Sequence, residues 1–229
     1  MKDLAVIETI LRNRHHFFLE IRDGIGLSQK MRAMFISSIV FLALYGAVLG
    51  STHSLWQTLS SAVKLPVLFL ATLIVCSPTL YFFNVLFGSN QSLTQNVALI
   101  LTTITVTSVI LLSFAPIVVF FLLTTSGYQF FKLLNVGILT IGGIVGVVFL
   151  GQGMGIVASA GKGGGQARRV VLWLWILIYA FVGSQMAWTL RPFIGAPSMQ
   201  FELFRQLGGN FYANIFASIG EILGFFVVR

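Results

Sequence analysis

Glu221 is the one acidic side chain within a long apolar segment of this 229-residue sequence. Asn214 and Ser218 precede it at steps of four and three residues, so on a helix the three side chains form one polar stripe. An ionised carboxylate is unfavourable in lipid, and the stripe must therefore meet another helix, water or the membrane interface. It is interpreted either as the lining of a pore or proton path or as a polar contact within the protein. The second interpretation is favoured.

The other residues able to bind a metal ion or act as nucleophiles are scattered. His15 and His16 are adjacent and would point about 100° apart on a helix, which does not suit one shared metal ion. His53 stands alone in a short loop, and Cys76 is the single cysteine. The glycine-rich run around Lys162 lacks the Gly-x-x-x-x-Gly-Lys-Ser/Thr spacing of a phosphate-binding loop and is interpreted as a flexible linker. We expect no metal, no cofactor and no enzymatic activity.

The composition is that of a membrane protein. Hydrophobic residues make up 57% and charged residues 9% of the chain, whereas charged residues make up about 25% of a soluble domain. The net charge of +8 would suggest a nucleic-acid partner in a soluble protein, but here the charges lie at the ends of apolar runs. They are therefore interpreted as topology signals, and no nucleic-acid partner is expected.

Six segments contain roughly the 20 mainly apolar residues that a spanning helix requires. The sequence thus predicts an all-α, polytopic transmembrane helical bundle. The last segment is short and contains the Asn214 stripe, so the alternative is five spans with the last segment lying in the membrane interface. The six predicted spans are residues 31–50, 65–87, 97–123, 133–157, 170–190 and 211–228.

Residues 1–30 are predicted to form a cytoplasmic amphipathic helix at the membrane interface. Their apolar residues recur at three- and four-residue steps, which places them on one helix face. We expect this face to rest on the headgroup layer or on the cytoplasmic ends of the bundle, and residues 31–229 to form a single transmembrane domain. The apolar residues are Leu4, Ile7, Leu11, Phe18, Ile21 and Ile25.

Basic residues orient the predicted bundle. In the six-span arrangement, ten of the fourteen Lys and Arg residues fall on the side of the N-terminus. The positive-inside rule therefore predicts a cytoplasmic N-terminus, and we expect a bacterial inner (cytoplasmic) membrane. Membrane lipids are expected partners of the basic residues nearest the headgroups. These are Arg12, Arg14, Arg22, Lys30, Arg32, Arg168 and Arg169.

Small and polar residues within the spans predict close helix packing. Three glycine pairs have the small-xxx-small spacing that lets helix backbones approach: Gly46 and Gly50, Gly142 and Gly146, Gly151 and Gly155. Amides and hydroxyls in or near the spans usually bond between helices, although they could also line a route for a neutral solute. They are Asn84, Thr102, Thr103, Thr107, Asn135 and Gln185.

Two stretches resemble patches of uncharacterised bacterial multi-pass membrane proteins. They are residues 77–84 (SPTLYFFN) and residues 190–195 (LRPFIG), the latter continuing through residues 204–205 to residues 210–212 (NFY). The layout of the first four spans, with its proline-containing second span, resembles Yip1-type membrane proteins, whereas residues 191–212 depart from that layout. The resemblance implies a membrane scaffold or adaptor role and transfers no functional residue.

These features lead to two hypotheses about function. The first is a non-catalytic integral membrane protein that acts as a scaffold or accessory subunit of a membrane protein or lipid assembly. Its partners would be membrane lipids and other membrane subunits or further copies of the chain, bound through the glycine faces, the N-terminal helix and the apolar outer residues 191–210. The alternative is a homo-oligomeric channel or transporter in which Asn214, Ser218 and Glu221 face water.

Overall fold

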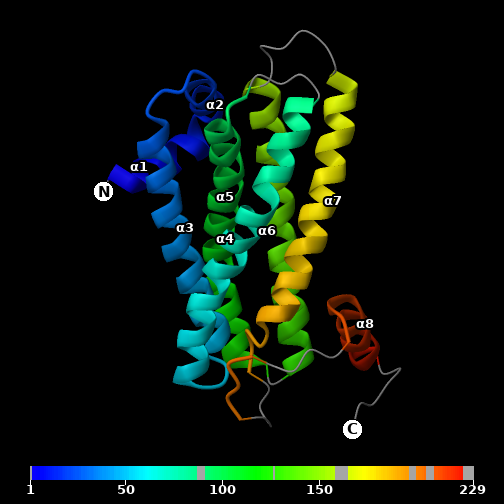
Figure 1. Cartoon of the computed structure of the whole chain (residues 1–229). Helices are drawn as coiled ribbons and strands as arrows, with labels where there is room; N and C mark the ends of the chain where they lie inside the picture. Colours follow the sequence, from blue (N-terminus) through cyan, green and yellow to red (C-terminus); the bar gives the residue numbers. More distant parts are fainter. Residues whose placement is uncertain are drawn as a thin grey trace.

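The computed structural model of the chain is a bundle of long helices with short helices at both ends (Figure 1). It describes residues 2–86, 91–125, 127–157, 165–195, 200–204 and 209–223, without the side chains of residues 2–4, 165–169 and 171. Within these ranges every regular element is a helix. The elements are α1 (Lys2–Arg12), α2 (Arg14–Arg22), α3 (Leu27–Gly50), α4 (Leu55–Leu86), α5 (Leu93–Thr124), α6 (Tyr128–Val157), α7 (Gly165–Leu190) and α8 (Phe211–Ile222).

Five of these helices, α3 to α7, are long and apolar enough to cross a membrane. They run side by side in Figure 1, with α1 and α2 at one end of the bundle and α8 at the other. The predicted all-α membrane fold is thereby confirmed. The sixth predicted span is not confirmed, because the described part of α8 has 12 residues, which is about 18 Å of helix against about 30 Å of hydrocarbon. Residues 224–228 of that span lie outside the described residues.

The spanning helices extend beyond the predicted segments. α4 and α5 each have 32 residues, or about 48 Å, which exceeds the hydrocarbon core and reaches the headgroup layers. The largest difference is at α4, which begins at Leu55 and not at residue 65. Polar residues such as Gln57 and Lys64 lowered the local hydropathy there, but they are helical because their side chains bond to other parts of the protein.

The α5 helix is the centre of the bundle. Every residue from Ala98 to Ser108 is buried, and α5 packs against α3, α4 and α6. It begins with a capping box, in which Ser92 Oγ accepts from the Gln95 amide at 3.2 Å and Gln95 Oε1 accepts from the Ser92 amide at 2.8 Å.

α7 is peripheral, and Trp175 is its single buried residue among the described side chains. The Trp175 indole donates to the Cys76 carbonyl at 3.0 Å and joins α7 to α4.

The N-terminal residues form two helices and not the single predicted one. The chain changes direction at Asn13, whose backbone is non-helical (φ −132°, ψ 43°). After α2, Gly24 and Gly26 adopt positive φ values of 73° and 62°, which favour glycine and turn the chain into α3. We call α1 and α2 the N-terminal helix pair.

The apolar side of the N-terminal helix pair is packed on the bundle itself. Ile10, Phe17, Phe18 and Ile21 are at most 1% exposed. They belong to the same core cluster as Leu99 and Met154 of α5 and α6. Of the two surfaces expected to receive this apolar face, the end of the bundle is the one it contacts in the structure.

Two of the three predicted glycine pairs lie at close helix contacts. A Cβ at Gly46 or Gly50 would stand 2.4 Å from a carbonyl oxygen of α4, and a Cβ at Gly146 would stand 2.5 Å from Thr107 Oγ1 of α5. The pair Gly151 and Gly155 makes no such approach, because an added Cβ would meet one atom at 3.9 Å at the former and none within 4 Å at the latter among the described residues.

Gly153 also lies at a close helix contact, which the spacing of the glycines does not predict. A Cβ at this position would stand 2.6 Å from the Phe18 ring and 2.7 Å from Leu99 Cδ2. Gly153 therefore leaves the space on α6 that Phe18 of α2 occupies. The spacing rule could not find it, because its neighbour across the contact is an aromatic ring and not a second backbone.

Replacement of Gly46 by alanine should destabilise the bundle. The new Cβ would collide with the Ser61 carbonyl of α4, a backbone atom that moves only with its helix. We expect a loss of about 1–3 kcal/mol in the free energy of unfolding, typical of overpacking. Gly143→Ala is the matched control, since a Cβ there meets no atom within 4 Å. Unfolding in mixed detergent micelles measures both variants, and equal stabilities would contradict the close contact.

Candidate functional site

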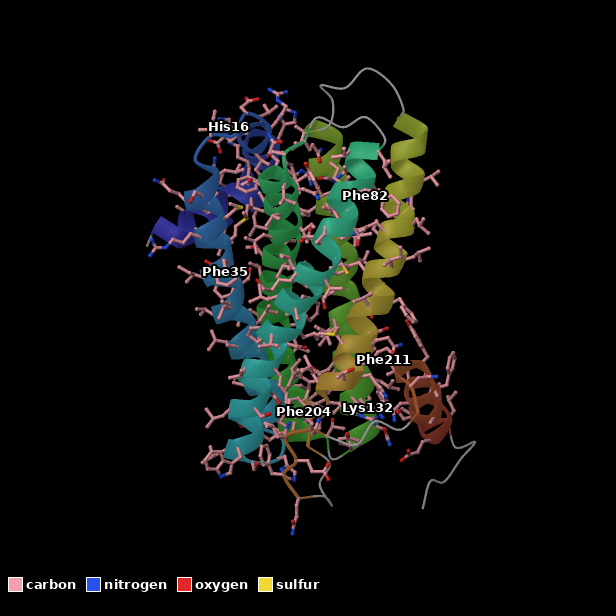
Figure 2. The ribbon with its side chains drawn as sticks, viewed as in Figure 1. His16, Phe35, Phe82, Lys132, Phe204 and Phe211 are labelled. Carbon is pink, nitrogen blue, oxygen red and sulfur yellow. The ribbon has the colours of Figure 1, made fainter. Side chains whose placement is uncertain are left out.

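The polar stripe of α8 faces the first two turns of α6. Lys132 Nζ donates to Asn214 Oδ1 at 3.0 Å, and Gln129 Nε2 donates to Glu221 Oε2 at 2.7 Å. Ser218, between them, is 2% exposed and donates to the Asn214 carbonyl. Figure 2 places Lys132 and Phe211, the first residue of α8, at the end of the bundle opposite His16. In this arrangement the stripe joins α8 to α6.

An open pocket of about 290 Å³ adjoins Glu221. Its other lining residues are Ile222 of α8 and residues 127–130 at the start of α6. Glu221 is the only acidic or basic residue in this lining. General acid–base chemistry needs a proton donor and an acceptor placed around one substrate. Tyr128 also belongs to this lining, but the described contact of Glu221 is with Gln129.

The polar side chains inside the bundle bond to each other and to backbone carbonyls. Tyr45 of α3 donates to Asn135 of α6 at 2.9 Å, and the Asn135 amide donates to the Phe131 carbonyl at 2.7 Å. Ser38 of α3 shares a hydrogen bond of 3.0 Å with Thr105 of α5. Such bonds between spanning helices contribute about 0.6 kcal/mol each on average and fix which helix faces lie together.

The six predicted polar residues are distributed over several contacts. Asn84 donates to Asn96 Oδ1 of α5 at 3.3 Å, and Thr107 donates to the Gly142 carbonyl of α6 at 3.1 Å. Thr102 and Thr103 donate to carbonyls of their own helix, four residues earlier. Asn135 bonds to Tyr45 and to the Phe131 carbonyl. The sixth, Gln185, is partly exposed on α7. The buried members of this set act between or within helices.

The residues after α7 close the end of the bundle where α8 lies. Gln57, Ser61 and Lys64 form a second polar stripe, on α4. Gln57 donates to the Pro192 carbonyl at 2.9 Å, and Ser61 donates to the Phe193 carbonyl at 2.6 Å. This end of α4 thus provides donors for backbone that lies outside any helix and cannot bond to itself.

Lys64 joins the two described parts of that segment, residues 191–195 and 200–204. Its ammonium donates to the carbonyls of Pro192 and Leu203 and lies 4.9 Å from the centre of the Phe204 ring. Lys64 is 5% exposed. In the sequence, Lys64 stands directly before the second predicted span and is interpreted only as a topology signal. Its steps of three and seven residues from Ser61 and Gln57 were the signal that could have identified this stripe.

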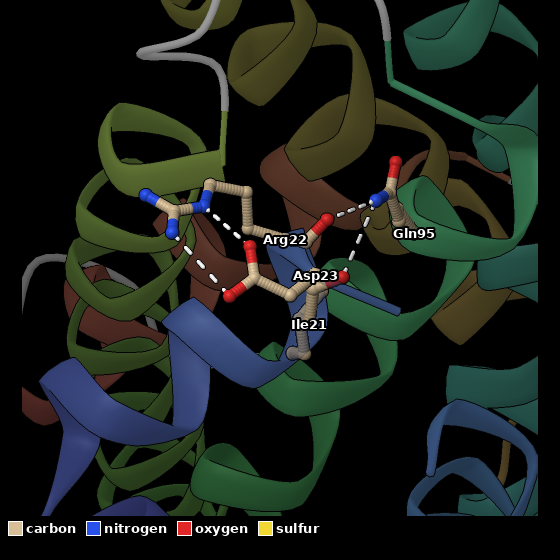
Figure 3. Close-up of polar contacts among 4 residues, drawn as sticks. All are labelled: Ile21, Arg22, Asp23 and Gln95. Atoms are coloured by element: carbon tan, nitrogen blue, oxygen red, sulfur yellow. Dashed lines mark hydrogen bonds and ion pairs between the residues drawn. The ribbon is translucent and has the colours of Figure 1, made fainter. Parts of the chain in front are cut away.

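At the opposite end, Gln95 of α5 holds the end of α2. Its side-chain amide donates to the carbonyls of Ile21 at 3.3 Å and Arg22 at 2.7 Å (Figure 3). These carbonyls belong to the last turn of α2, where helix carbonyls run short of donors, and the Ile21 carbonyl also accepts from the Gly24 amide at 3.2 Å. The same side chain accepts from the Ser92 amide in the capping box. Gln95 therefore connects the start of α5 to the N-terminal helix pair.

The predicted lipid-contacting residues differ in their surroundings. Arg12 pairs with Glu8 at 2.7 Å, Arg22 with Asp23 at 2.8 Å and Lys30 with Glu20 at 3.0 Å. Arg14 and Arg32 are exposed. The side chains of Arg168 and Arg169 lie outside the described residues. The hydrogen bond from Arg22 lowers the pKa of Asp23, so the small stabilisation from this exposed pair is lost as the pH falls through that lowered pKa.

Among the described residues, no three His, Cys, Asp or Glu side chains are grouped so that they could hold a metal ion. His53 instead packs against the segment that follows α7. A Cβ at Gly195 would stand 2.4 Å from His53, so glycine is needed there for the close approach. Cys76 is buried in α4 at 2% exposure.

Comparison of the chain with models of protein families, with curated proteins and with solved structures finds no match. The function of this protein must therefore be inferred from its own residues and their contacts.

Gln95→Glu should release the end of α2 while it preserves the cap of α5. A glutamate still accepts from the Ser92 amide, but it cannot donate to the Ile21 and Arg22 carbonyls. Leaving the Arg22 carbonyl without this donor weakens the contact by about 1–3 kcal/mol, while the Ile21 carbonyl keeps its bond from the Gly24 amide. Hydrogen exchange in nanodiscs should therefore speed up over residues 17–25 and stay unchanged at Ser92.

Gln95→Leu is the companion variant, since leucine removes both functions. It should speed exchange over residues 17–25 and at the start of α5 as well. Unchanged exchange of α2 in the Gln95→Glu variant would mean that the amide of Gln95 does not hold this helix.

Proposed function

We propose that this protein is a non-catalytic integral membrane protein that acts as a scaffold or accessory subunit of a membrane protein or lipid assembly. The observation that carries the proposal is the use of the polar side chains. Several of those in the bundle interior, on α8 and on α4 bond to neighbouring helices and loops, among them Tyr45, Thr107 and Ser61. They support a rigid body that presents outer surfaces to partners.

The distribution of charge supports an N-terminus in the cytoplasm, and we place the protein in a bacterial inner membrane. Five of the basic residues expected at the headgroups, Arg12 to Arg32, lie on the N-terminal helix pair or the first turns of α3. An excess of Lys and Arg marks the cytoplasmic side. With five spans, α8 then lies at the outer interface, where its 12 residues suit a helix that does not cross.

Two surfaces are suited to partners in this proposal. The outer side of α2 carries Arg14 and His15, both exposed, while its inner side is fixed to the bundle. α7 has one buried residue among its described side chains, so most of its apolar surface meets lipid or a partner helix. Contact through α7 would be within the membrane, and contact through α2 would be at its surface.

The alternative function, a homo-oligomeric channel or transporter, needs Asn214, Ser218 and Glu221 to face water. Lys132 and Gln129 of α6 already bond to the first and last of these side chains. Ser218 is buried. These contacts support a packing role for the stripe and leave the subunit function as the proposal.

Charge reversal on the outer side of α2 should release a protein partner. The test is the double variant Arg14→Glu with His15→Glu, which changes exposed side chains and leaves Phe17, Phe18 and Ile21 in the core. With the unmodified chain, we expect a partner protein to co-purify stoichiometrically. With the double variant, the amount of partner per chain should fall by roughly tenfold or more, as for the loss of a charged contact at an interface. Quantitative mass spectrometry of the purified complex gives the ratio.

Ser51→Glu provides the control, since it adds a charge at an exposed position on the opposite end of the bundle. It should leave the partner in place. If the unmodified chain, the double variant and Ser51→Glu all recover equal amounts of partner, the N-terminal helix pair is not part of the binding surface.

A further inference from the structure

A second pocket, with an open volume of about 320 Å³, lies between α1, α2 and the start of α3. Ligand pockets range from about 300 to 1,000 Å³, so this one suits a headgroup-sized molecule. Both apolar and charged residues line it. The residues that matter for binding are Ala5 and Val6 of α1, His16, Phe17 and Glu20 of α2, and Lys30 of α3.

The charged residues of the lining include an anion and a cation in direct contact. Lys30 Nζ lies 3.0 Å from Glu20 Oε2, and the two side chains are only 16% and 23% exposed. Lys30 also donates to the Ile25 carbonyl at 2.7 Å. An ammonium has three N–H donors, so one remains for a ligand oxygen. The contacts of Glu20 with Lys30 and His16 both use Oε2, so Oε1 can accept from a ligand donor.

We expect the pocket to open at the depth of the lipid headgroups. Phe35 and Ile36 of α3 are 44% and 39% exposed and belong to the apolar outer surface of the bundle. Figure 2 shows Phe35 on that surface, nearer the middle of the bundle than His16. Lys30 precedes Phe35 by five residues, which is about 7.5 Å along the helix axis. A charged residue one to two turns beyond the lipid-facing apolar residues lies in the headgroup layer.

We propose that this pocket binds the headgroup of a zwitterionic phospholipid with a primary amine, of the phosphatidylethanolamine type. The lipid phosphate accepts from Lys30, and the lipid ammonium donates to Glu20. Phe17, Val6 and Ala5 contact the carbon atoms between and below these groups. The paired charges of Glu20 and Lys30 match a ligand that carries both signs, whereas a purely anionic headgroup would meet the Glu20 carboxylate.

The amine distinguishes this ligand from choline lipids. A primary ammonium can donate a hydrogen bond to Glu20, while a trimethylated ammonium has no N–H to donate. The site would give the protein a lipid preference whether or not it acts as a subunit of a larger assembly. Its failure would therefore leave the proposed function standing.

The test is native mass spectrometry of the full-length protein released from nanodiscs that contain phosphatidylethanolamine and phosphatidylcholine with identical acyl chains. We expect the unmodified protein to retain one ethanolamine lipid over the choline lipid by roughly tenfold, as for one hydrogen bond to a charged group. Glu20→Gln should bring this ratio close to one. The matched control Glu8→Gln removes a carboxylate that does not line the pocket and should keep the preference.

A second variant tests the pocket without disturbing the Glu20–Lys30 pair. Ala5 is exposed and lines the pocket, so Ala5→Phe should fill the space and abolish the preference. Leu11→Phe places the same phenyl ring on the same helix at an exposed position that does not line the pocket, and it should have no effect. If both ethanolamine and choline lipids are retained equally, or if Ala5→Phe leaves the ratio unchanged, the proposal is wrong.

Soluble phosphoethanolamine separates a lipid ligand from a free metabolite of the same chemistry. Without acyl chains it is not concentrated at the membrane surface, and millimolar amounts should not displace the lipid. Displacement would assign the pocket to a soluble ligand and would overturn the lipid site.

Discussion

Hydrocarbon supplies no hydrogen-bond partners, so each polar group buried in this bundle must find one within the protein. This constraint acts most strongly on α5, which is buried continuously from Ala98 to Ser108 and packs against three other spanning helices. Its hydroxyls donate to carbonyls one turn earlier or to facing helices. Gly146 lets α6 approach α5 closely, and Gly46 lets α3 approach α4, because each leaves room for atoms with which a Cβ would collide.

Both ends of the bundle meet the same constraint in the same way. A side-chain donor on a spanning helix bonds to backbone carbonyls of another segment. Gln95 does this for the last turn of α2, and Lys64 does it for the residues around Pro192 and Leu203. The donors lie near the ends of their helices, where apolar packing gives way to the interface. Each end is thus fixed to the bundle by a small number of polar side chains.

The sequence was sufficient for the helical class, for five apolar helices and for the close contacts at Gly46 and Gly146, because these depend on periodicity and local spacing. It was insufficient wherever a residue's environment comes from a distant segment. Lys64 was assigned to a loop because a charge lowers hydropathy, although carbonyls more than a hundred residues away surround it. The break at Asn13 and the role of Gly153 depend likewise on how α2 packs against α6, which no local pattern records.

The central functional claim is that the polar groups of this protein hold its own helices together and leave its outer surfaces for partners. The most direct test is the mass of the intact complex, measured by native mass spectrometry after gentle extraction from the native membrane. The account predicts one copy of the chain, or a fixed number of copies, in stoichiometric association with a different membrane protein. A closed ring that contains only identical chains would contradict it and would support the channel with the Glu221 stripe facing water.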